Sequence, residues 1–186
     1  MQKFYETERL SLKVLDKSSA DQVLDYYRRN KDFLKEWEPE REESFYTLAC
    51  QEKLLEQDSM DMNRNISLRL WIYKKEECNK VIGSLAFTNI VRGVFLSCYL
   101  GYKLDRDEIN KGFMTEAVNK GIEIMFQDYG LHRIEANIMP KNAGSLGVVN
   151  KLGFYNEGIA RNYLKINGKW EDHIHMVLLN GKDRIE

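Results

Sequence analysis

The hydrophobic pattern of the chain changes its period at Phe113, and this change limits the folds that the chain can adopt. The stretch from 95 to 104 is rich in aromatic and apolar residues and is typical of a strand. From Phe113 to Tyr129, apolar residues recur every three or four positions, which predicts a helix with one buried side. A polar loop that ends at Gly112 joins the two. The segment therefore predicts a strand, a short loop and a long helix in succession.

The rest of the pattern predicts a mixed α/β fold. Strands are expected at 8–15, 67–73, 81–90, 95–104, 132–139, 155–166 and 169–179, and helices after Ser18, from Ser44, at 113–129 and between Asn142 and Gly153. Asn167-Gly168 is the strongest hairpin signal, because both residues tolerate the positive φ of a tight turn, and Gly93 favours a second hairpin at 91–94. The order of hairpin, helix, strand, helix and hairpin indicates an α+β layout around an antiparallel sheet. No repeat or linker interrupts it, so residues 1–186 are expected to form one domain.

Some side-chain placements are expected as well. The helix from Ser44 is expected to bury its apolar residues, namely Phe45, Leu48, Ala49 and Leu55. Glu116 and Lys120 are expected to form an i,i+4 pair on the exposed side of the long helix. The acidic run at 36–43 is typical of a solvated loop, and it would also suit a rim that attracts a cationic substrate.

Composition restricts the class of protein. Of the 186 residues 43% are hydrophobic, but no apolar run approaches the roughly 20 residues of a membrane helix, so no membrane contact is expected. The 28 Lys and Arg residues nearly balance the 29 Asp and Glu, which argues against direct nucleic-acid binding because a non-specific binder carries a basic excess. The three cysteines are widely spaced and the N-terminus has no signal-peptide pattern. Both features favour a reduced, cytoplasmic location.

The loop before the long helix is a candidate anion site. Amides at a helix N-terminus lack intrahelical partners and lie at the positive end of the helix dipole. Gly112 lets an anion approach the backbone closely, and Lys111 adds a cation. The chain contains neither GxxxxGK[ST] nor a GxGxxG motif after a strand, so the standard nucleotide-binding loops are absent. Taken alone, a glycine near a helix start more often belongs to an ordinary turn.

Segments spaced along the whole chain carry a family resemblance. They are Glu6–Leu10, Asn89–Gly93 with Cys98–Tyr102, Asn110–Ala117, Leu131–Asn137, Asn142–Phe154 and Asn167–His173. In this order they resemble the GNAT superfamily of acetyl-CoA-dependent N-acetyltransferases, and within it the RimJ/RimL branch that acetylates protein N-termini. The resemblance implies a GNAT-like fold with a central, mostly antiparallel, twisted sheet of six to seven strands flanked by about four helices.

The resemblance also implies acetyl-CoA as the co-substrate, with no metal, and assigns the residues that would bind it. The cofactor-binding residues it implies are Tyr102, Lys103, Leu104, Ile109, Asn110, Lys111, Gly112, Phe113, Met114, Thr115, Asn142 and Ser145. The pyrophosphate is expected on the amides around 110–115. The family prefers Arg or Gln where this chain has Ile109, and Gly or Ala where it has Met114. Because backbone amides do most of the binding, the loop is expected to keep its function.

The catalytic residues that the resemblance implies are Ser145, which would hydrogen-bond the CoA sulfur, and Tyr99, near the reacting amine. A solvated serine and a packing tyrosine are the alternatives for these two. The tyrosine acid of many superfamily members is replaced by Val149, which cannot donate a proton. His173 and His175 alternate onto one strand face, but without a third ligand at readable spacing they do not indicate a metal site.

The chemistry of the amine favours one acceptor class. An N-terminal amine with a pKa of about 7.7–8.0 is roughly a quarter neutral near pH 7.4, whereas a lysine with a pKa of about 10.4 is neutral in about one molecule in a thousand. An α-amine therefore needs little help from a base. The implied partner is a protein or peptide N-terminus, such as that of a ribosomal protein with N-terminal alanine, and a homodimer is compatible with it. Two alternatives stay open, namely an acetyltransferase of a small amine such as a polyamine or aminoglycoside, and a non-catalytic acyl-CoA-binding module.

Overall fold

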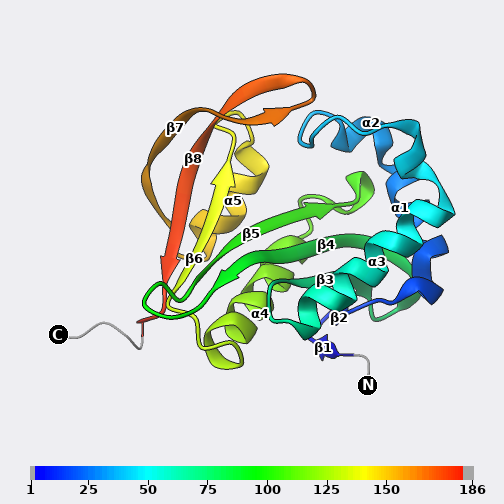
Figure 1. Cartoon of the computed structure of the whole chain (residues 1–186), viewed down its shortest axis with the longest axis horizontal. Helices are drawn as coiled ribbons and strands as arrows, with labels where there is room; N and C mark the ends of the chain where they lie inside the picture. The colour runs from blue at the N-terminus through cyan, green and yellow to red at the C-terminus, as the bar shows by residue number, and fades with distance from the viewer. Residues whose placement is uncertain (1–2, 182–186) are drawn as a thin grey trace.

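An eight-stranded sheet runs through the protein, which a computed structural model describes over residues 3–181 (Figure 1). The strands are β1 (Phe4–Glu6), β2 (Leu10–Lys13), β3 (Leu68–Lys74), β4 (Glu77–Val91), β5 (Ser97–Leu104), β6 (Arg133–Ile138), β7 (Tyr155–Ile166) and β8 (Lys169–Leu179). Their order across the sheet is β1-β2-β3-β4-β5-β6-β8-β7. Every neighbouring pair is antiparallel except β5 and β6, which are parallel. The sheet is therefore mostly antiparallel, as expected.

The parallel pair opens into a fork. β5 and β6 pair only where 97–99 lie beside 133–135, and the last paired residues are Tyr99 and Glu135. β5 then continues to Leu104 and β6 to Ile138 without pairing to each other. In Figure 1 the two strands diverge from this point. We call the space between the two unpaired ends the fork.

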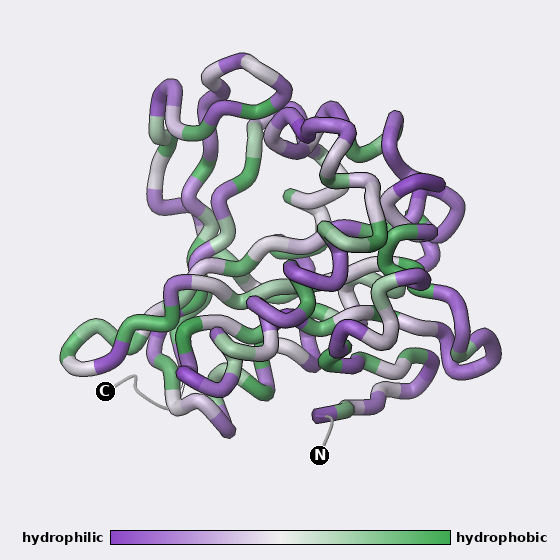
Figure 2. The backbone as a smooth tube through the Cα atoms, turned by 45° about the vertical axis from the view of Figure 1, so that its right-hand side comes forward, coloured by the Kyte–Doolittle hydropathy of each residue, from purple (hydrophilic) through white to green (hydrophobic). Residues whose placement is uncertain are grey.

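Helices cover both faces of the sheet. The α-helices are α1 (Ala20–Arg29), α2 (Lys31–Leu34), α3 (Leu48–Asn63), α4 (Phe113–Gln127) and α5 (Ala143–Lys151), and 3-10 turns lie at Lys17–Ser19, Glu43–Tyr46 and Arg106–Glu108. α4 and α5 pack on one face, and α1 and α3 pack on the other (Figure 1). Hydrophilic residues follow much of the outer loops, while apolar residues alternate with them along the strands (Figure 2). Strands β3 and β4 therefore have apolar side chains on both faces.

Strand β3 shows how the pattern places the two cores. Leu70 and Ile72 are fully buried in the larger core, which includes α4 and α5. Trp71 and Tyr73 alternate with them and pack in the smaller core with α1. Side chains on a strand point to opposite faces in turn, so one short segment supplies both cores. On α4, Gly121 permits close packing, since a Cβ there would lie 2.6 Å from Cδ1 of Leu85.

Two short elements add to the expected counts of strands and helices. The additional strand is β1, with three residues, and the additional helix is α2, with four. Neither is long enough to show a hydrophobic period, which explains why the sequence pattern did not indicate them. All seven strands and all four helices that were expected are present, with ends shifted by a few residues.

Two expected side-chain placements were wrong. Thr47 caps α3, so the helix starts at Leu48 rather than Ser44, and this start leaves Leu48 and Ala49 exposed. Phe45 and Leu55 are buried as expected. Glu116 does not pair with Lys120. It instead accepts hydrogen bonds from Thr7 and Arg9 at the start of the chain, at 2.6 and 2.7–2.8 Å, while Lys120 pairs with Glu123.

Candidate functional site

The N-terminus of α4 opens at one end of the fork. Gly112 is its N-cap residue with φ +81°, and Asn110 has φ +61°. Both lie in the left-handed region, which glycine and asparagine tolerate better than other residues. This backbone leads from β5 into α4 and leaves the first amides of the helix without intrahelical partners. The position at which the sequence predicts an anion site is thus a helix start whose first amides lack intrahelical partners.

Ion pairs hold the loop that precedes α4. Asp105 is paired with Arg29 of α1 and also accepts a hydrogen bond from the amide of Asp107 at 3.1 Å. Glu108 is buried and lies between Lys74 at 3.2 Å and Lys111 at 3.0 Å. The Lys111 ammonium is therefore engaged with a carboxylate of its own loop.

A cavity of about 600 Å³ occupies the fork and reaches the N-termini of α4 and α5. Among the expected cofactor residues, those that line it are Tyr102, Lys103, Leu104, Ile109, Asn110, Gly112, Phe113, Met114, Thr115, Asn142 and Ser145. Lys111 is not among the lining residues. Residues that the sequence pattern did not indicate also line the cavity, among them Phe33 of α2, Trp37 after it, Lys141 before α5 and Lys151 at its end. The segment at 33–37 has no hydrophobic period or motif that could have indicated this position.

Two hydrogen bonds organise the start of α5 at the fork. The side-chain oxygen of Asn142 accepts a hydrogen bond from the Ser145 amide at 3.0 Å and so caps the helix. The Tyr102 hydroxyl on β5 donates to the Ser145 carbonyl oxygen at 2.7 Å. Burial raises the pKa of Tyr102, so its phenol remains a neutral donor. Ser145 lines the cavity, and its hydroxyl is within hydrogen-bonding reach of the Tyr102 phenol.

Tyr99 lies elsewhere, at the branching point of the fork, and is 39% exposed. It does not line the large cavity. Its side chain is on the face of β5 opposite to Cys98 and Leu100, which are buried against α4. The Tyr163 phenol on β7 lies close to Tyr99. Burial and this neighbour raise the pKa of Tyr163. We call the face of the sheet that carries Tyr99 the acceptor face.

A buried carboxylate was missed on the acceptor face. Glu135 of β6 accepts hydrogen bonds from Arg133 at 2.8 Å and contacts Nδ1 of His175 on β8 at 2.7 Å. Burial opposes its ionisation, but these partners and Asn137 hold the pKa of Glu135 below its usual range. The two residues of the contact are 40 positions apart. No local pattern could have indicated it, because it depends on the pairing of β6 with β8.

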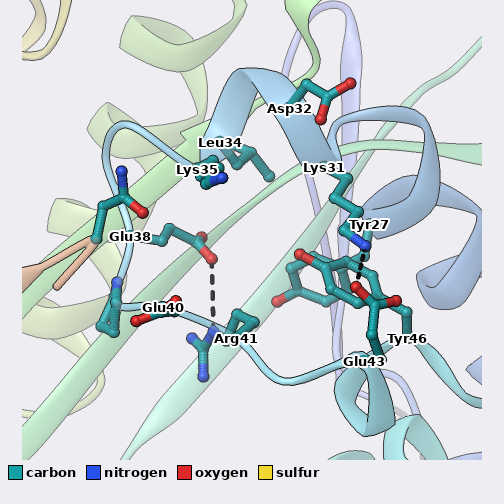
Figure 3. A pocket seen from close by; sticks show the side chains of 12 residues that line it. Tyr27, Lys31, Asp32, Leu34, Lys35, Glu38, Glu40, Arg41, Glu43 and Tyr46 are labelled. Atoms are coloured by element: carbon teal, nitrogen blue, oxygen red, sulfur yellow. Dashed lines mark hydrogen bonds and ion pairs between the residues drawn. The ribbon is translucent and has the colours of Figure 1, made fainter.

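The acidic run lies beside a second, smaller cavity of about 230 Å³ (Figure 3). Glu38 is paired with Lys103 and lies 3.8 Å from Arg41, and Glu43 is paired with Lys31 at 2.6 Å. The run is therefore partly neutralised. The Asn167 amide donates to the Glu38 carbonyl oxygen at 3.0 Å, which joins the β7–β8 hairpin to this loop.

Two absences characterise residues 3–181. No described helix is long and apolar enough to span a membrane. No group of three or more His, Cys, Asp or Glu side chains in this part of the chain is placed to hold a metal ion. His173 is buried, and burial lowers its pKa below the usual range, so its ring is neutral.

Comparison with known proteins gives a consistent result. A family model described as an acetyltransferase (GNAT) domain matches residues 9–155. The ribosomal protein uS5-alanine N-acetyltransferase of Escherichia coli (strain K12) is 36% identical over 168 residues, which are 90% of this chain and 86% of that protein. The structure of ribosomal-protein-S5-alanine acetyltransferase from Vibrio fischeri has a TM-score of 0.92 at 36% identity and covers 98% of this chain and 100% of its own. RimJ of Mycobacterium smegmatis, solved in complex with CoA-disulfide, has a TM-score of 0.88 at 22% identity, and the match covers 95% of this chain and 85% of RimJ. At this identity the match shows a similar fold.

Proposed function

The chain belongs to the GNAT family of acetyltransferases, and we propose that it transfers the acetyl group of acetyl-CoA to the N-terminal α-amine of a protein, with a ribosomal protein that begins with alanine or serine as the preferred class of acceptor. The observation that carries the proposal is the cavity in the fork, which is lined by all but one of the residues assigned to acetyl-CoA from the sequence. The relatives named for the alanine of ribosomal protein uS5 or S5 support the choice of acceptor.

The cavity fits acetyl-CoA in size and charge. Its volume of about 600 Å³ lies within the range of ordinary ligand sites. The amides at the start of α4 would hold the pyrophosphate, because a helix N-terminus attracts anions. Lys151 lines the same cavity and has no ion-pair partner within residues 3–181, so its ammonium is available for a phosphate. The CoA-disulfide complex of M. smegmatis RimJ, which shares this fold, is consistent with such a ligand.

Ser145 would act on the leaving group. Ser145 lines the cavity, and its amide and carbonyl are both held by hydrogen bonds, to Asn142 and from Tyr102. The backbone therefore positions the hydroxyl, which can interact with both the Tyr102 phenol and a ligand. A hydrogen bond from this hydroxyl would stabilise the departing sulfur, and Val149, which is fully buried, offers no alternative acid at the position the superfamily often uses.

The acceptor would approach from the other face of the fork. Tyr99 is exposed at the branching point, where a peptide N-terminus could reach the thioester. The hydrogen bond between Asn167 and Glu38 holds the β7–β8 hairpin against the acidic loop and narrows the path of the acceptor on that side. An acceptor whose first residue has a small side chain is therefore favoured. The partial neutralisation of the acidic run by Lys31, Lys103 and Arg41 weakens the case for a free polyamine or aminoglycoside.

The test is mass spectrometry of peptides incubated with acetyl-CoA. Peptides that contain one lysine and begin with alanine, serine or a large residue are offered with free or blocked N-termini, beside spermidine and an aminoglycoside. We expect acetylation of the free α-amine, fastest after alanine or serine, and none of the blocked peptides. Acetylation confined to lysine, or to the small amines, would refute the proposal and favour the corresponding alternative acceptor.

A further inference from the structure

A histidine and a buried carboxylate form a contact on the acceptor face. Nδ1 of His175 lies 2.7 Å from Oε1 of Glu135, which is 9% exposed. His175 is the register partner of Asn137, two residues beyond the branching point on β6. Paired residues of neighbouring antiparallel strands present their side chains on the same face. The histidine therefore lies on the acceptor face beside the open part of the fork.

The partners of Glu135 decide which nitrogen of His175 carries the proton. Arg133 donates to Glu135 at 2.8 Å, and an ionised carboxylate can only accept hydrogen bonds. Nδ1 of His175 must therefore carry hydrogen toward it, which leaves the lone pair of a neutral ring on Nε2. Nε2 has no hydrogen-bond partner within residues 3–181 and is not among the buried unpaired atoms, so it is open to solvent.

One cation and two carboxylates lie around the histidine. The titratable and polar groups that face it are Arg133, Glu135 and Asn137 on β6, Glu157 and Tyr163 on β7, His173 on β8 and, next to Tyr163, Tyr99 on β5. Arg133 binds both carboxylates of this group, Glu135 at 2.8 Å and Glu157 at 2.7–2.8 Å. The Tyr163 ring stands against His175 with centroids 5.1 Å apart. One carboxylate is thus aimed at the histidine, and the ring beside it limits its movement.

We propose that His175, oriented by Glu135, is the general base that takes the proton of the acceptor amine, directly or through one water. This rests on the proposed acetyl transfer. The acceptor ammonium loses one proton to Nε2, and the neutral amine nitrogen bonds to the thioester carbon as the carbon–sulfur bond breaks. A second amine proton passes to the CoA sulfur. The products are the amide and the CoA thiol, and the imidazolium returns its proton to solvent.

The decisive variant is His175→Gln, which keeps a polar side chain beside Glu135 but cannot take up a proton. We expect kcat at pH 7 to fall by about 100-fold, near the lower end for a general base, with little change in the KM of acetyl-CoA. Without the base, the variant depends on acceptor amine that is already neutral, so its kcat should follow the titration of the α-amine, with a pKa of about 7.7–8.0, more closely than kcat of the native enzyme does. In His175→Ala, added imidazole should restore part of the rate. Melting temperatures establish that both variants are folded.

His173→Gln is the matched control. His173 is on the same strand and contacts the same Tyr163 ring, but its Nδ1 lies 3.0 Å from the Glu171 carbonyl oxygen and it has no carboxylate partner within residues 3–181. Its pH profile should match that of the native enzyme. A native kcat and pH profile in His175→Gln would overturn the proposal, as would an altered pH profile in His173→Gln alone.

Nitrogen-15 NMR of the imidazoles gives a readout that needs no acceptor. The proposal requires the neutral His175 ring to carry hydrogen on Nδ1, and Glu135→Gln should weaken that preference. A neutral ring protonated on Nε2 would refute it even in an active enzyme. Conversely, acetylation of small amines or lysines alone would refute the proposed acceptor, and the His175 variants would then be assayed with that acceptor.

Discussion

The hydroxyl of Tyr102 on β5 donates a hydrogen bond of 2.7 Å to the carbonyl oxygen of Ser145 on α5. These elements lie on opposite sides of the fork, where β5 and β6 no longer pair. The bond therefore links the two sides of the fork at a point where β5 and β6 form no hydrogen bonds with each other. It also ties Ser145 to the strand that carries Tyr102.

Tyr102→Phe removes this bond and leaves the ring. We expect the free energy of unfolding to fall by about 1 kcal/mol, the usual contribution of one hydrogen bond, as measured by urea denaturation. The rate of acetyl transfer should fall as well, because Ser145 is less well positioned. Tyr155→Phe is the control, since its hydroxyl bond to Glu157 is exposed and should contribute little. Equal stability of the two variants would contradict this role of Tyr102.

Gly112→Val tests the anion site at α4. The new side chain would strain a backbone at φ +81° and obstruct the amides that face the phosphates, so CoA affinity measured by calorimetry should fall at least about tenfold. Its Cβ would also lie 3.3 Å from Nη2 of Arg9. Gly93→Val is the matched control, because Gly93 has φ +74° in the β4–β5 hairpin, away from the cavity. A folded Gly112→Val protein with native CoA affinity would remove the site assignment.

Ser145→Ala tests the proposed leaving-group role. Loss of one hydrogen-bonding acid should lower kcat by roughly tenfold to a few hundredfold, with little change in the KM of acetyl-CoA. The free energy of unfolding should fall by no more than about 1 kcal/mol, because the variant keeps the hydrogen bonds that Asn142 and Tyr102 make with the Ser145 backbone. Steady-state kinetics and thermal melting measure the two effects. Native turnover would show that this serine has no part in the chemistry.

Two helical glycines should respond to alanine in opposite directions. In Gly121→Ala the new methyl would lie 2.6 Å from Cδ1 of Leu85 and 2.8 Å from the Phe87 ring, and such overpacking costs about 1–3 kcal/mol. In Gly147→Ala the methyl meets nothing within 4 Å, and the higher helix propensity of alanine should stabilise by up to about 1 kcal/mol. Denaturant midpoints measure both. A stabilising Gly121→Ala would contradict the close packing of α4 on β4.

Local signals were enough to predict most elements and the cavity loop. Gly112 and Asn142 mark helix starts by their own chemistry, and Asn167-Gly168 forms the expected tight turn, with φ of +43° and +79°. The residues around Gly112 follow one another in the chain, so their resemblance to a family motif was enough to group them at one site. Such features depend on neighbours within a few residues, and the sequence therefore determines them.

Only the tertiary structure decided what meets across the sheet. The contact between Glu135 and His175 requires β6 to pair with β8 in one register. Lys111, which the sequence assigns to the ligand, instead forms an ion pair with Glu108. Trp37 reaches the cavity only because the segment after α2 folds over the fork. Each of these contacts depends on the register and packing of segments that are distant in the chain, and no local pattern specifies them. The hydrophobic periods and caps that form each helix and strand, by contrast, are local.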